Sequence, residues 1–298
     1  MAKTVFLTGA TGFIGTAIVS ELINNGYQVR GLTRSEEGSQ SLRAAGAETL
    51  LGDVNDLDAL RKGAETADAV IHTAFDHDFS KYKQNCEADR KVIEALGAVL
   101  VGSNRPFVVT SGTSVAKVAP GEVATEQSPA LDSSVVARAA SEEAAAAVAK
   151  LGVSVRVVRN SQVHDTRKQG LVSFAIDIAR KKGSSAYVGD GGNRWSAVHL
   201  SDTALLYRLA LEKGEAGGVY HAVAEEGVAF REIAETIGKG LNLPVNSLTP
   251  EEANAHFSWF APFVGRANVV SSKTTQKQLA WQPAGAGLIA DLCKMYNL

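Results

Sequence analysis

Short apolar segments alternate with longer amphipathic segments through the first half of the chain. The apolar run at residues 5–7 stops at Gly9, and after Gly12 apolar residues recur at helical spacing at Ile14, Ile18 and Leu22. Segments of strand length that alternate with segments of helix length are typical of a parallel sheet with helices on both faces. The pattern therefore predicts an α/β fold with a Rossmann-type, doubly wound parallel sheet.

The same pattern places the other elements of this half. Further strands are expected at residues 27–33, 48–51, 68–72, 107–110 and 153–158. Helices are expected at residues 57–62, 86–101 and 133–150, and Asp56 is the expected N-cap of the first of these. The last helix is rich in alanine on one face, which predicts close packing, either on the sheet or across the interface of a homodimer.

The pattern changes near residue 160. Beyond it we expect helices at residues 171–182, 201–213, 230–241 and from 287 onward, with one strand at 219–223. We therefore divide the chain into a dinucleotide-binding domain over residues 1–160 and a smaller, mostly helical substrate-binding part over residues 161–298.

Composition excludes several classes of function. The net charge of −2 gives no broad basic surface for nucleic acid or for an anionic membrane. The two cysteines lack the spacing of metal ligands, so we expect no metal site. No apolar run is long enough to span a membrane, and the first predicted strand starts too early to leave room for a signal peptide. A cytoplasmic protein with a small-molecule substrate is the simplest expectation.

Three glycines follow the first predicted strand. Gly9 allows a tight turn, Gly12 lets a ligand approach the backbone, and Gly15 allows the helix to pack closely on its strand. The helix that follows offers free N–H groups and the positive end of its dipole. Strand, glycine turn and helix in this order predict a binding site for the pyrophosphate of a dinucleotide.

The string TGATGFIG at residues 8–15 resembles the extended and atypical short-chain dehydrogenase/reductases, which include the NAD-dependent epimerases and dehydratases. The block at residues 187–202 resembles a later segment of the same proteins. The resemblance implies that segments of about 197–223 return to the first domain. It also implies that the cofactor contacts Gly9, Thr11, Gly12, Phe13, Ile14, Gly15, Asp53, Val54, Thr73, Ala74 and Phe75.

The end of the second strand predicts which dinucleotide is bound. Relatives specific for NAD carry an acid there to bind the ribose hydroxyls, whereas this chain has Thr33 followed by Arg34. An arginine suits a 2′-phosphate, so we expect NADP(H) to be preferred, with NAD(H) bound more weakly. The alternative is that Arg34 is a solvated surface charge.

The catalytic residues implied by the resemblance are altered. Gly112 falls where relatives carry a catalytic hydroxyl, which leaves Thr113 as the best substitute. None of the six tyrosines is followed four residues later by a lysine, so the usual Tyr-x-x-x-Lys pair is absent. Aligning Glu142 with the family's glutamate puts Arg138 in the lysine position, where it would hold the nicotinamide ribose, and Ser134 in the tyrosine position.

The loop after the fourth strand offers another proton donor. His77 stands between Asp76 and Asp78, and two carboxylates would raise the pKa of the imidazole. The alternative is a hydrated surface turn.

Three functions are compatible with these observations. The first is an NADP(H)-dependent oxidoreductase of the atypical short-chain type that reduces a carbonyl or a related small molecule. The second is an epimerase or dehydratase of sugar nucleotides. The third is a non-catalytic NADP-binding sensor or regulatory protein, which the missing tyrosine and lysine would suit.

Overall fold

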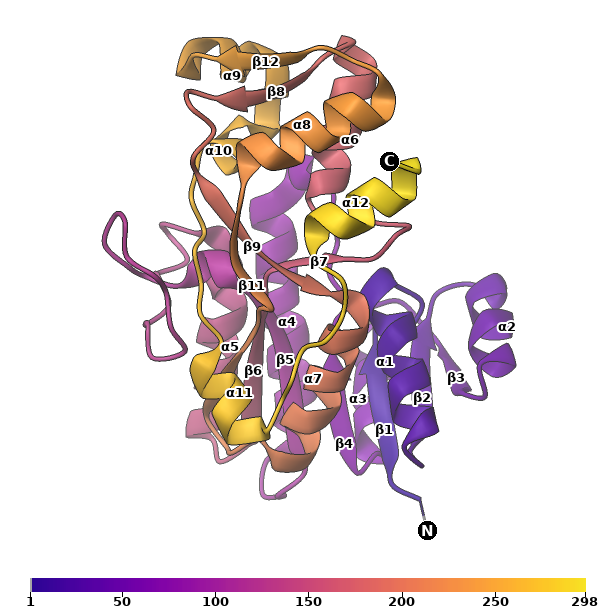
Figure 1. The fold of residues 1–298 in the computed structure, drawn as a ribbon. Coiled ribbons are helices and arrows are strands. Elements are labelled where there is room, and N and C mark those ends of the chain that lie inside the picture. Colours follow the sequence, from indigo (N-terminus) through magenta and orange to yellow (C-terminus); the bar gives the residue numbers. More distant parts are fainter. Residues whose placement is uncertain (1) are drawn as a thin grey trace.

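A seven-stranded parallel sheet forms the centre of the molecule (Figure 1). The computed structural model describes residues 2–298. The strand order is β10-β6-β5-β4-β1-β2-β3, so the order reverses between β1 and β4. Ligands of open α/β folds bind at the carboxyl edge of such a reversal. The strands are β1 (Thr4–Thr8), β2 (Gln28–Thr33), β3 (Glu48–Leu51), β4 (Ala69–His72), β5 (Pro106–Gly112), β6 (Ser154–Asn160) and β10 (Gly218–Ala222).

Helices cover both faces of this sheet, as the alternating pattern predicts. On one face α1 (Phe13–Asn24) packs against α7 (Leu200–Lys213), and on the other α4 (Tyr82–Leu100) packs against α3 (Leu57–Glu65) and α5 (Ala140–Lys150). Helix α2 (Glu36–Ala44) packs beside β3. Successive residues of β1 enter the two cores alternately, because side chains along a strand point to opposite faces: Val5 and Leu7 to one, Phe6 to the other.

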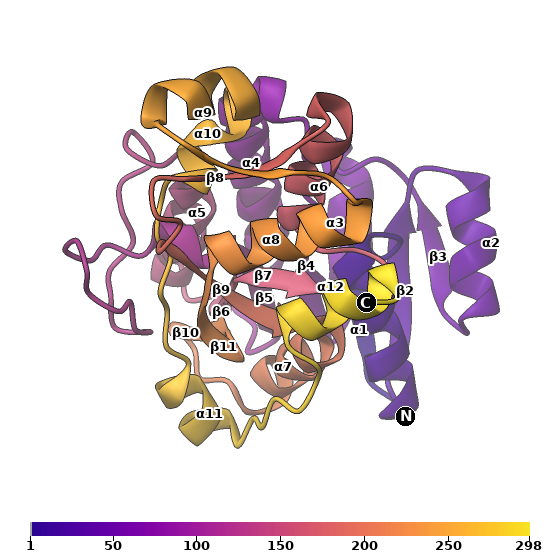
Figure 2. The same ribbon diagram turned by 45° about the horizontal axis from the view of Figure 1, so that its top comes forward.

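Most of the second half of the chain lies over the carboxyl edge of the sheet, while α7, β10 and the helix at residues 273–279 lie beside the main sheet (Figures 1 and 2). Its helices are α6 (Val172–Lys182), α8 (Phe230–Leu241), α9 (Pro250–Phe257), α10 (Ala261–Val264), α11 (Lys273–Leu279) and α12 (Leu288–Tyr296). It also contains five strands that the hydrophobic pattern does not predict: β7 (Gln162–His164), β8 (Ser185–Val188), β9 (Arg194–His199), β11 (Glu225–Ala229) and β12 (Val245–Leu248). These form a three-stranded and a two-stranded sheet, while β10 pairs with β6 in the main sheet.

The helix expected from residue 133 begins later. Helix α5 starts at Ala140, after a short 3-10 turn at Ala137–Ala139. Upstream of it, carboxylates bind backbone N–H groups: Asp132 accepts from Ser134 (2.8 Å), and Glu143 accepts from Ser133 (2.8 Å). Side chains that satisfy the backbone in this way compete with helical hydrogen bonds. The expectation was therefore wrong for the first seven residues.

A chain of buried polar contacts joins the strand ends at the carboxyl edge. His72 at the end of β4 is 1% exposed, and its two ring nitrogens lie 2.7 Å from Thr8 Oγ1 and 2.8 Å from Asp89 Oδ1. The other Asp89 oxygen accepts from Arg138 Nη1 at 2.7 Å, and Arg138 Nη2 donates to the Thr110 carbonyl at 2.9 Å. These contacts connect β1, β4 and β5 to α4 and to the turn before α5.

Asp89 carries the negative charge in this series of buried contacts. Burial alone would raise the pKa of its carboxyl, but Arg138, His72 and a hydrogen bond from Ser141 outweigh burial and hold the pKa well below its usual range. The carboxylate is therefore ionised in the folded protein. A buried ion that loses its partner costs far more than an exposed one.

We expect Asp89→Asn to destabilise the protein in a pH-dependent way. The pKa of an aspartate in the unfolded chain is about 3.9, and the pKa of Asp89 in the folded protein is lower. The difference stabilises the folded protein at pH values above about 3.9, and this stabilisation is lost as the pH falls from there through the folded-state pKa. At pH 7 the variant should lose about 3–5 kcal/mol of unfolding free energy in urea. The deficit should shrink as the pH is lowered from 5 towards 2.

Asp58→Asn is the matched control, because Asp58 is exposed and pairs with Arg61 on the surface of α3. It should change the unfolding free energy by less than about 1 kcal/mol. A deficit for Asp89→Asn that stays constant with pH would contradict the assignment of an ionised, paired Asp89.

Candidate active site

The glycine loop has the geometry of an anion site. Gly9 has φ of +71°, and its carbonyl accepts the Gly12 N–H at 2.9 Å, which closes a tight turn. Gly12 then caps α1 with extended backbone and without a side-chain hydrogen bond. The N–H groups of the first turn of α1 therefore stay available to a ligand.

The loop has no room for side chains at two of its glycines. A Cβ atom at Gly15 would lie 1.9 Å from the Gly9 carbonyl oxygen, and one at Gly9 would lie 2.6 Å from the Ala74 nitrogen. At Gly12 a Cβ would meet the Gly9 oxygen at 3.1 Å, a tight contact that a small shift relieves. The close approach of α1, β1 and the loop after β4 forms a cradle that fits a dinucleotide.

Polar atoms without partners lie at the same edge of the sheet. Ser111 Oγ near the end of β5 and Asn160 Oδ1 at the end of β6 are buried and lack a hydrogen-bond partner among residues 2–298. Buried polar atoms are normally satisfied, so such atoms at a ligand-binding edge are consistent with a bound ligand. Asn160 also donates to the buried Tyr207 hydroxyl at 3.0 Å.

The end of β2 presents a free cation. Arg34 is exposed and makes no ion pair or side-chain hydrogen bond within the described part of the chain. The next residue, Ser35, caps α2 by accepting the Gly38 N–H at 3.1 Å. A helix start beside a free guanidinium suits a phosphate.

At the end of β3, one oxygen of Asp53 accepts hydrogen bonds from the backbone and side chain of Asn55, and the neighbouring Val54 is half-buried.

The loop after β4 lies against the glycine loop. Thr73 Oγ1 donates to the Thr8 carbonyl at 2.8 Å, and the Arg138 guanidinium lies over the Phe75 ring at 4.3 Å from its centroid. The structure thus brings Thr73, Ala74 and Phe75 to the cradle and Arg138 to the next position along the same edge. Arg138 itself is bound to Asp89 and the Thr110 carbonyl, so its charge is compensated.

The expected pKa of His77 was wrong in direction. The side chain is exposed, yet neighbouring protein atoms displace part of its water and lower the pKa of the imidazole, and the positive charges of Arg138 and Lys168 lower it further. The Asp78 carboxylate accepts from the backbone and hydroxyl of Ser80. His77 therefore stays neutral at physiological pH.

The other predicted catalytic residues are not joined to Arg138. Thr113 is buried in a 3-10 turn after β5 (Thr113–Val115), and Ser134 is exposed in the turn that precedes α5. Among residues 2–298 no hydrogen bond connects either hydroxyl to Arg138. Because α5 begins at Ala140, Ser134 and Arg138 do not share a helical face.

Tyr82, the first residue of α4, was missed. Its ring lies 6.3 Å from the Phe75 ring, and burial raises the pKa of its hydroxyl to about 12, with Cys86 adding to the rise and Arg138 opposing it. Tyr82, Cys86 and Asp89 fall on one face of α4, since residues three and four apart are neighbours on a helix. That spacing was visible in the sequence, but nothing there showed that the face meets Arg138.

Aromatic side chains link this loop to the second half of the chain. We call Phe79, Tyr82, Phe174, Trp259 and Phe263 the aromatic wall. The Phe79 ring stacks on Tyr82 (5.3 Å between centroids) and on Trp259 (4.7 Å), and it meets Phe174 edge-on at 5.4 Å. Trp259 remains 43% exposed. The wall is an apolar surface next to Arg138.

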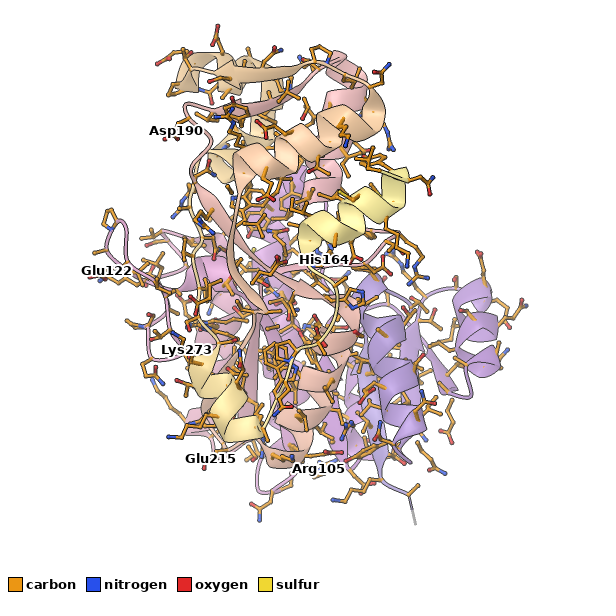
Figure 3. The ribbon with its side chains drawn as sticks, in the orientation of Figure 1. Arg105, Glu122, His164, Asp190, Glu215 and Lys273 are labelled. Carbon is orange, nitrogen blue, oxygen red and sulfur yellow. The ribbon has the colours of Figure 1, made fainter. Side chains whose placement is uncertain are left out.

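Other features lie away from this edge. The turn at Asp190 is near the far end of the second half, well above His164 (Figure 3).

Within residues 2–298 no cluster of three or more His, Cys, Asp or Glu side chains is arranged to hold a metal ion. A search of the same residues found no helix with the length and apolar character needed to cross a membrane.

Comparison with known proteins agrees with this architecture. The chain is 45% identical over 297 residues to the uncharacterized protein YLL056C of Saccharomyces cerevisiae, and the match covers 99% of each chain. It is 28% identical to a sterol-4-alpha-carboxylate 3-dehydrogenase (decarboxylating) of Dictyostelium discoideum, over 83% of this chain and 79% of that one.

Solved structures show the same fold. The dTDP-glucose 4,6-dehydratase DesIV of Streptomyces venezuelae, with NAD bound, superposes with a TM-score of 0.76 at 20% identity, over 98% of this chain and 96% of that one. The sequence model of the NAD dependent epimerase/dehydratase family matches residues 5–223. The chain belongs to the NAD dependent epimerase/dehydratase family.

Proposed function

We propose that this protein is an NADP(H)-dependent oxidoreductase that reduces the carbonyl group of a small, largely apolar molecule. The observation that carries the proposal is the cradle at Gly9–Gly15 together with the unpaired Arg34 at the start of α2. The cradle suits the pyrophosphate, and Arg34 suits a 2′-phosphate. NAD(H), which lacks that phosphate, would bind more weakly.

Bound NADPH would supply the hydride. The chain must then orient the carbonyl, exclude water and deliver a proton to the oxygen. Arg138, held by Asp89 and Thr110, is a fixed positive group on the face of Phe75. Because Asp89 compensates its charge, Arg138 acts mainly by holding the ribose and orienting neighbouring groups.

Tyr82 is the best proton donor beside Arg138. A hydroxyl with a pKa of about 12 is protonated at neutral pH and is still a much stronger acid than an alcohol. Neutral His77 lacks the second proton that an imidazolium would donate. Thr113 and Ser134, the donors expected from the sequence, could orient the carbonyl but are poor acids.

The aromatic wall favours an apolar substrate over a sugar nucleotide. Phe79 stacks on both Tyr82 and Trp259, and the part of Trp259 that remains exposed offers apolar surface for contact with planar or aliphatic groups. An epimerase or dehydratase also needs a strong base, and burial keeps Tyr82 protonated. The third possibility, a non-catalytic NADP-binding sensor, predicts binding without turnover of any carbonyl.

Gly12→Val should abolish dinucleotide binding, because the new side chain would stand at the N-terminus of α1, where the pyrophosphate must lie. Calorimetry with NADPH measures this directly. Gly265→Val is the control, since Gly265 has an ordinary backbone conformation and a Cβ there would meet only the Ala261 carbonyl oxygen, at an ordinary contact distance of 3.7 Å. Unchanged NADPH affinity in a folded Gly12→Val variant would show that the cradle is not the binding site.

Arg34→Ala should weaken NADPH binding about ten- to hundredfold, the loss expected for one charge-assisted hydrogen bond. NADH binding should change little, because NADH has no 2′-phosphate. Arg43→Ala removes the same charge from the other end of α2, where Arg43 pairs with Glu36, and should affect neither cofactor. Equal losses for NADPH and NADH in Arg34→Ala would exclude 2′-phosphate recognition.

Tyr82→Phe should lower carbonyl turnover about a hundredfold or more while leaving NADPH affinity unchanged, because it removes only the donated proton. NADPH oxidation with a panel of small ketones and aldehydes provides the assay. Tyr27→Phe makes the same change at a surface tyrosine bound to Glu212 and should have no effect. Full activity of Tyr82→Phe would rule out Tyr82 as the donor.

A further inference from the structure

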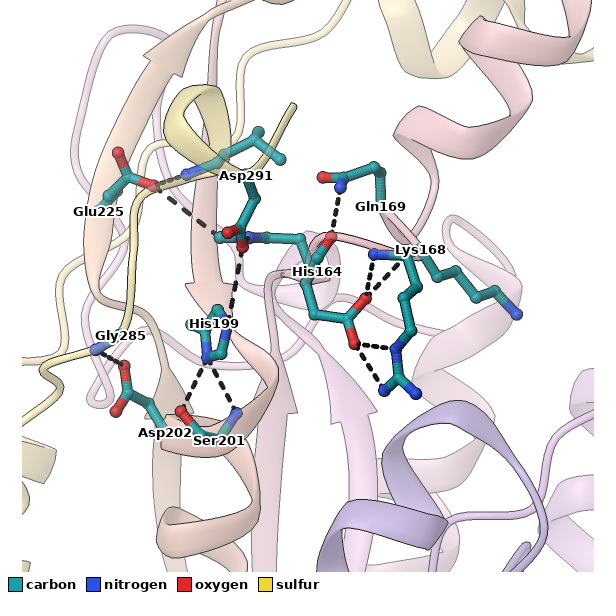
Figure 4. Close-up of polar contacts among 12 residues, drawn as sticks. His164, Lys168, Gln169, His199, Ser201, Asp202, Glu225, Gly285 and Asp291 are labelled. Carbon is teal, nitrogen blue, oxygen red and sulfur yellow. Dashed lines mark hydrogen bonds and ion pairs between the residues drawn. The ribbon is translucent and has the colours of Figure 1, made fainter. Parts of the chain in front are cut away.

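The turn between β7 and α6 holds its backbone rigidly. The Asp165 carboxylate accepts the backbone N–H groups of Arg167 (2.7 Å) and Lys168 (2.8 Å), and the Asp165 N–H donates to the Lys168 carbonyl at 2.9 Å (Figure 4). The buried side chain of Gln169 donates to the Asp165 carbonyl. The backbone of Lys168 is therefore fixed although its side chain is exposed.

The second half of the chain anchors this turn. His164, which precedes it, is fully buried, and its Nδ1 lies 2.7 Å from Asp291 Oδ2 on α12 (Figure 4). His199 at the end of β9 approaches the same carboxylate at 3.7 Å, and Glu225 on β11 accepts the Leu288 N–H at 2.7 Å. The position of Lys168 thus depends on the packing of β7, β9 and α12.

The two cations of the turn differ in their partners. Arg167 forms a two-pronged ion pair with Asp165, at 2.9 and 2.7 Å. Lys168 has no ion pair within the described part of the chain; its ammonium lies 5.6 Å from the centre of the Phe13 ring. Its charge also contributes to the lowered pKa of His77. The ammonium thus lies near both the first residue of α1 and the loop after β4.

Those two segments border the path that a dinucleotide takes through the cradle. A pyrophosphate at the N-terminus of α1 has backbone N–H groups on one side and needs positive charge on the other. Lysine serves phosphate as a mobile point charge, so its flexible side chain suits this role.

We propose that Lys168 is a cofactor-binding residue, supplied by the second half of the chain, whose ammonium binds the pyrophosphate of NADP(H) opposite the N-terminus of α1. This assignment rests on the proposed binding of NADP(H). Through this contact the cofactor joins the two halves of the protein, because α12 helps to hold the turn that carries Lys168.

The test compares Lys168→Gln with Arg167→Gln by fluorescence titration of NADPH at 50 and 300 mM salt. Lys168→Gln should bind NADPH about tenfold more weakly at the lower salt, with a smaller loss at the higher salt. Arg167→Gln removes an equal charge from the neighbouring position and should stay within about twofold of the wild type. Lys168→Arg should recover most of the affinity.

Adenosine 2′-monophosphate distinguishes the pyrophosphate from the 2′-phosphate, because it carries only the latter. Its binding should be unchanged in Lys168→Gln and weakened in Arg34→Ala. Equal weakening of NADPH and adenosine 2′-monophosphate in Lys168→Gln would overturn the assignment to the pyrophosphate.

Failure of this inference is separable from failure of the proposed function. Wild-type NADPH affinity in Lys168→Gln, together with weakened binding in Gly12→Val and Arg34→Ala, would refute the role of Lys168 and leave NADP(H) binding in place. A wild-type protein that binds no NADPH would overturn both. Thermal unfolding of each variant shows that the exposed substitutions leave the fold intact.

Discussion

The buried carboxylate of Asp89 is the constraint on which the carboxyl edge of the sheet depends. An ionised group without water must be paired, and Asp89 is paired with His72 on one oxygen and with Arg138 on the other. His72 in turn meets Thr8, directly before the glycine loop. One charge therefore fixes the relative positions of the cradle, helix α4 and the turn before α5.

This arrangement gives the site a different chemistry from a Tyr-x-x-x-Lys pair on one helix. A lysine ammonium in that place is free to act on a phenol beside it. Here the guanidinium of Arg138 is bound on two sides and faces the Phe75 ring. The phenol of Tyr82 comes from α4, and burial keeps it protonated. A cation and a phenol are both present, but Tyr82 stands on α4 and Arg138 in the turn before α5.

The second half of the chain contributes to the same edge in two ways. The aromatic wall packs Phe79 against Trp259 and Phe174, which forms an apolar surface beside the loop after β4. The turn around Asp165 brings the Lys168 ammonium near Phe13, the first residue of α1. Both contributions depend on small sheets and on α12, whose Asp291 meets His164 and His199. The second half of the chain therefore contributes side chains to the proposed site as well as lying over it.

The parallel sheet, the glycine loop and the family could all be predicted from the amino-acid sequence, because each of these depends on residues close together in the chain. The family resemblance implied that Thr73 to Phe75 contact the cofactor, and the loop that carries them lies against the glycine loop. The partners of Arg138 could not be predicted in this way, since Asp89 lies 49 residues away and hydrophobic periodicity carries no information about which charges meet. The same holds for the pKa of His77: its neighbouring carboxylates predict a rise, but desolvation by nearby protein atoms and the charges of Arg138 and Lys168 lower it. Local patterns determine where elements form, whereas burial and pairing of charges, which decide the chemistry, exist only after the elements have packed.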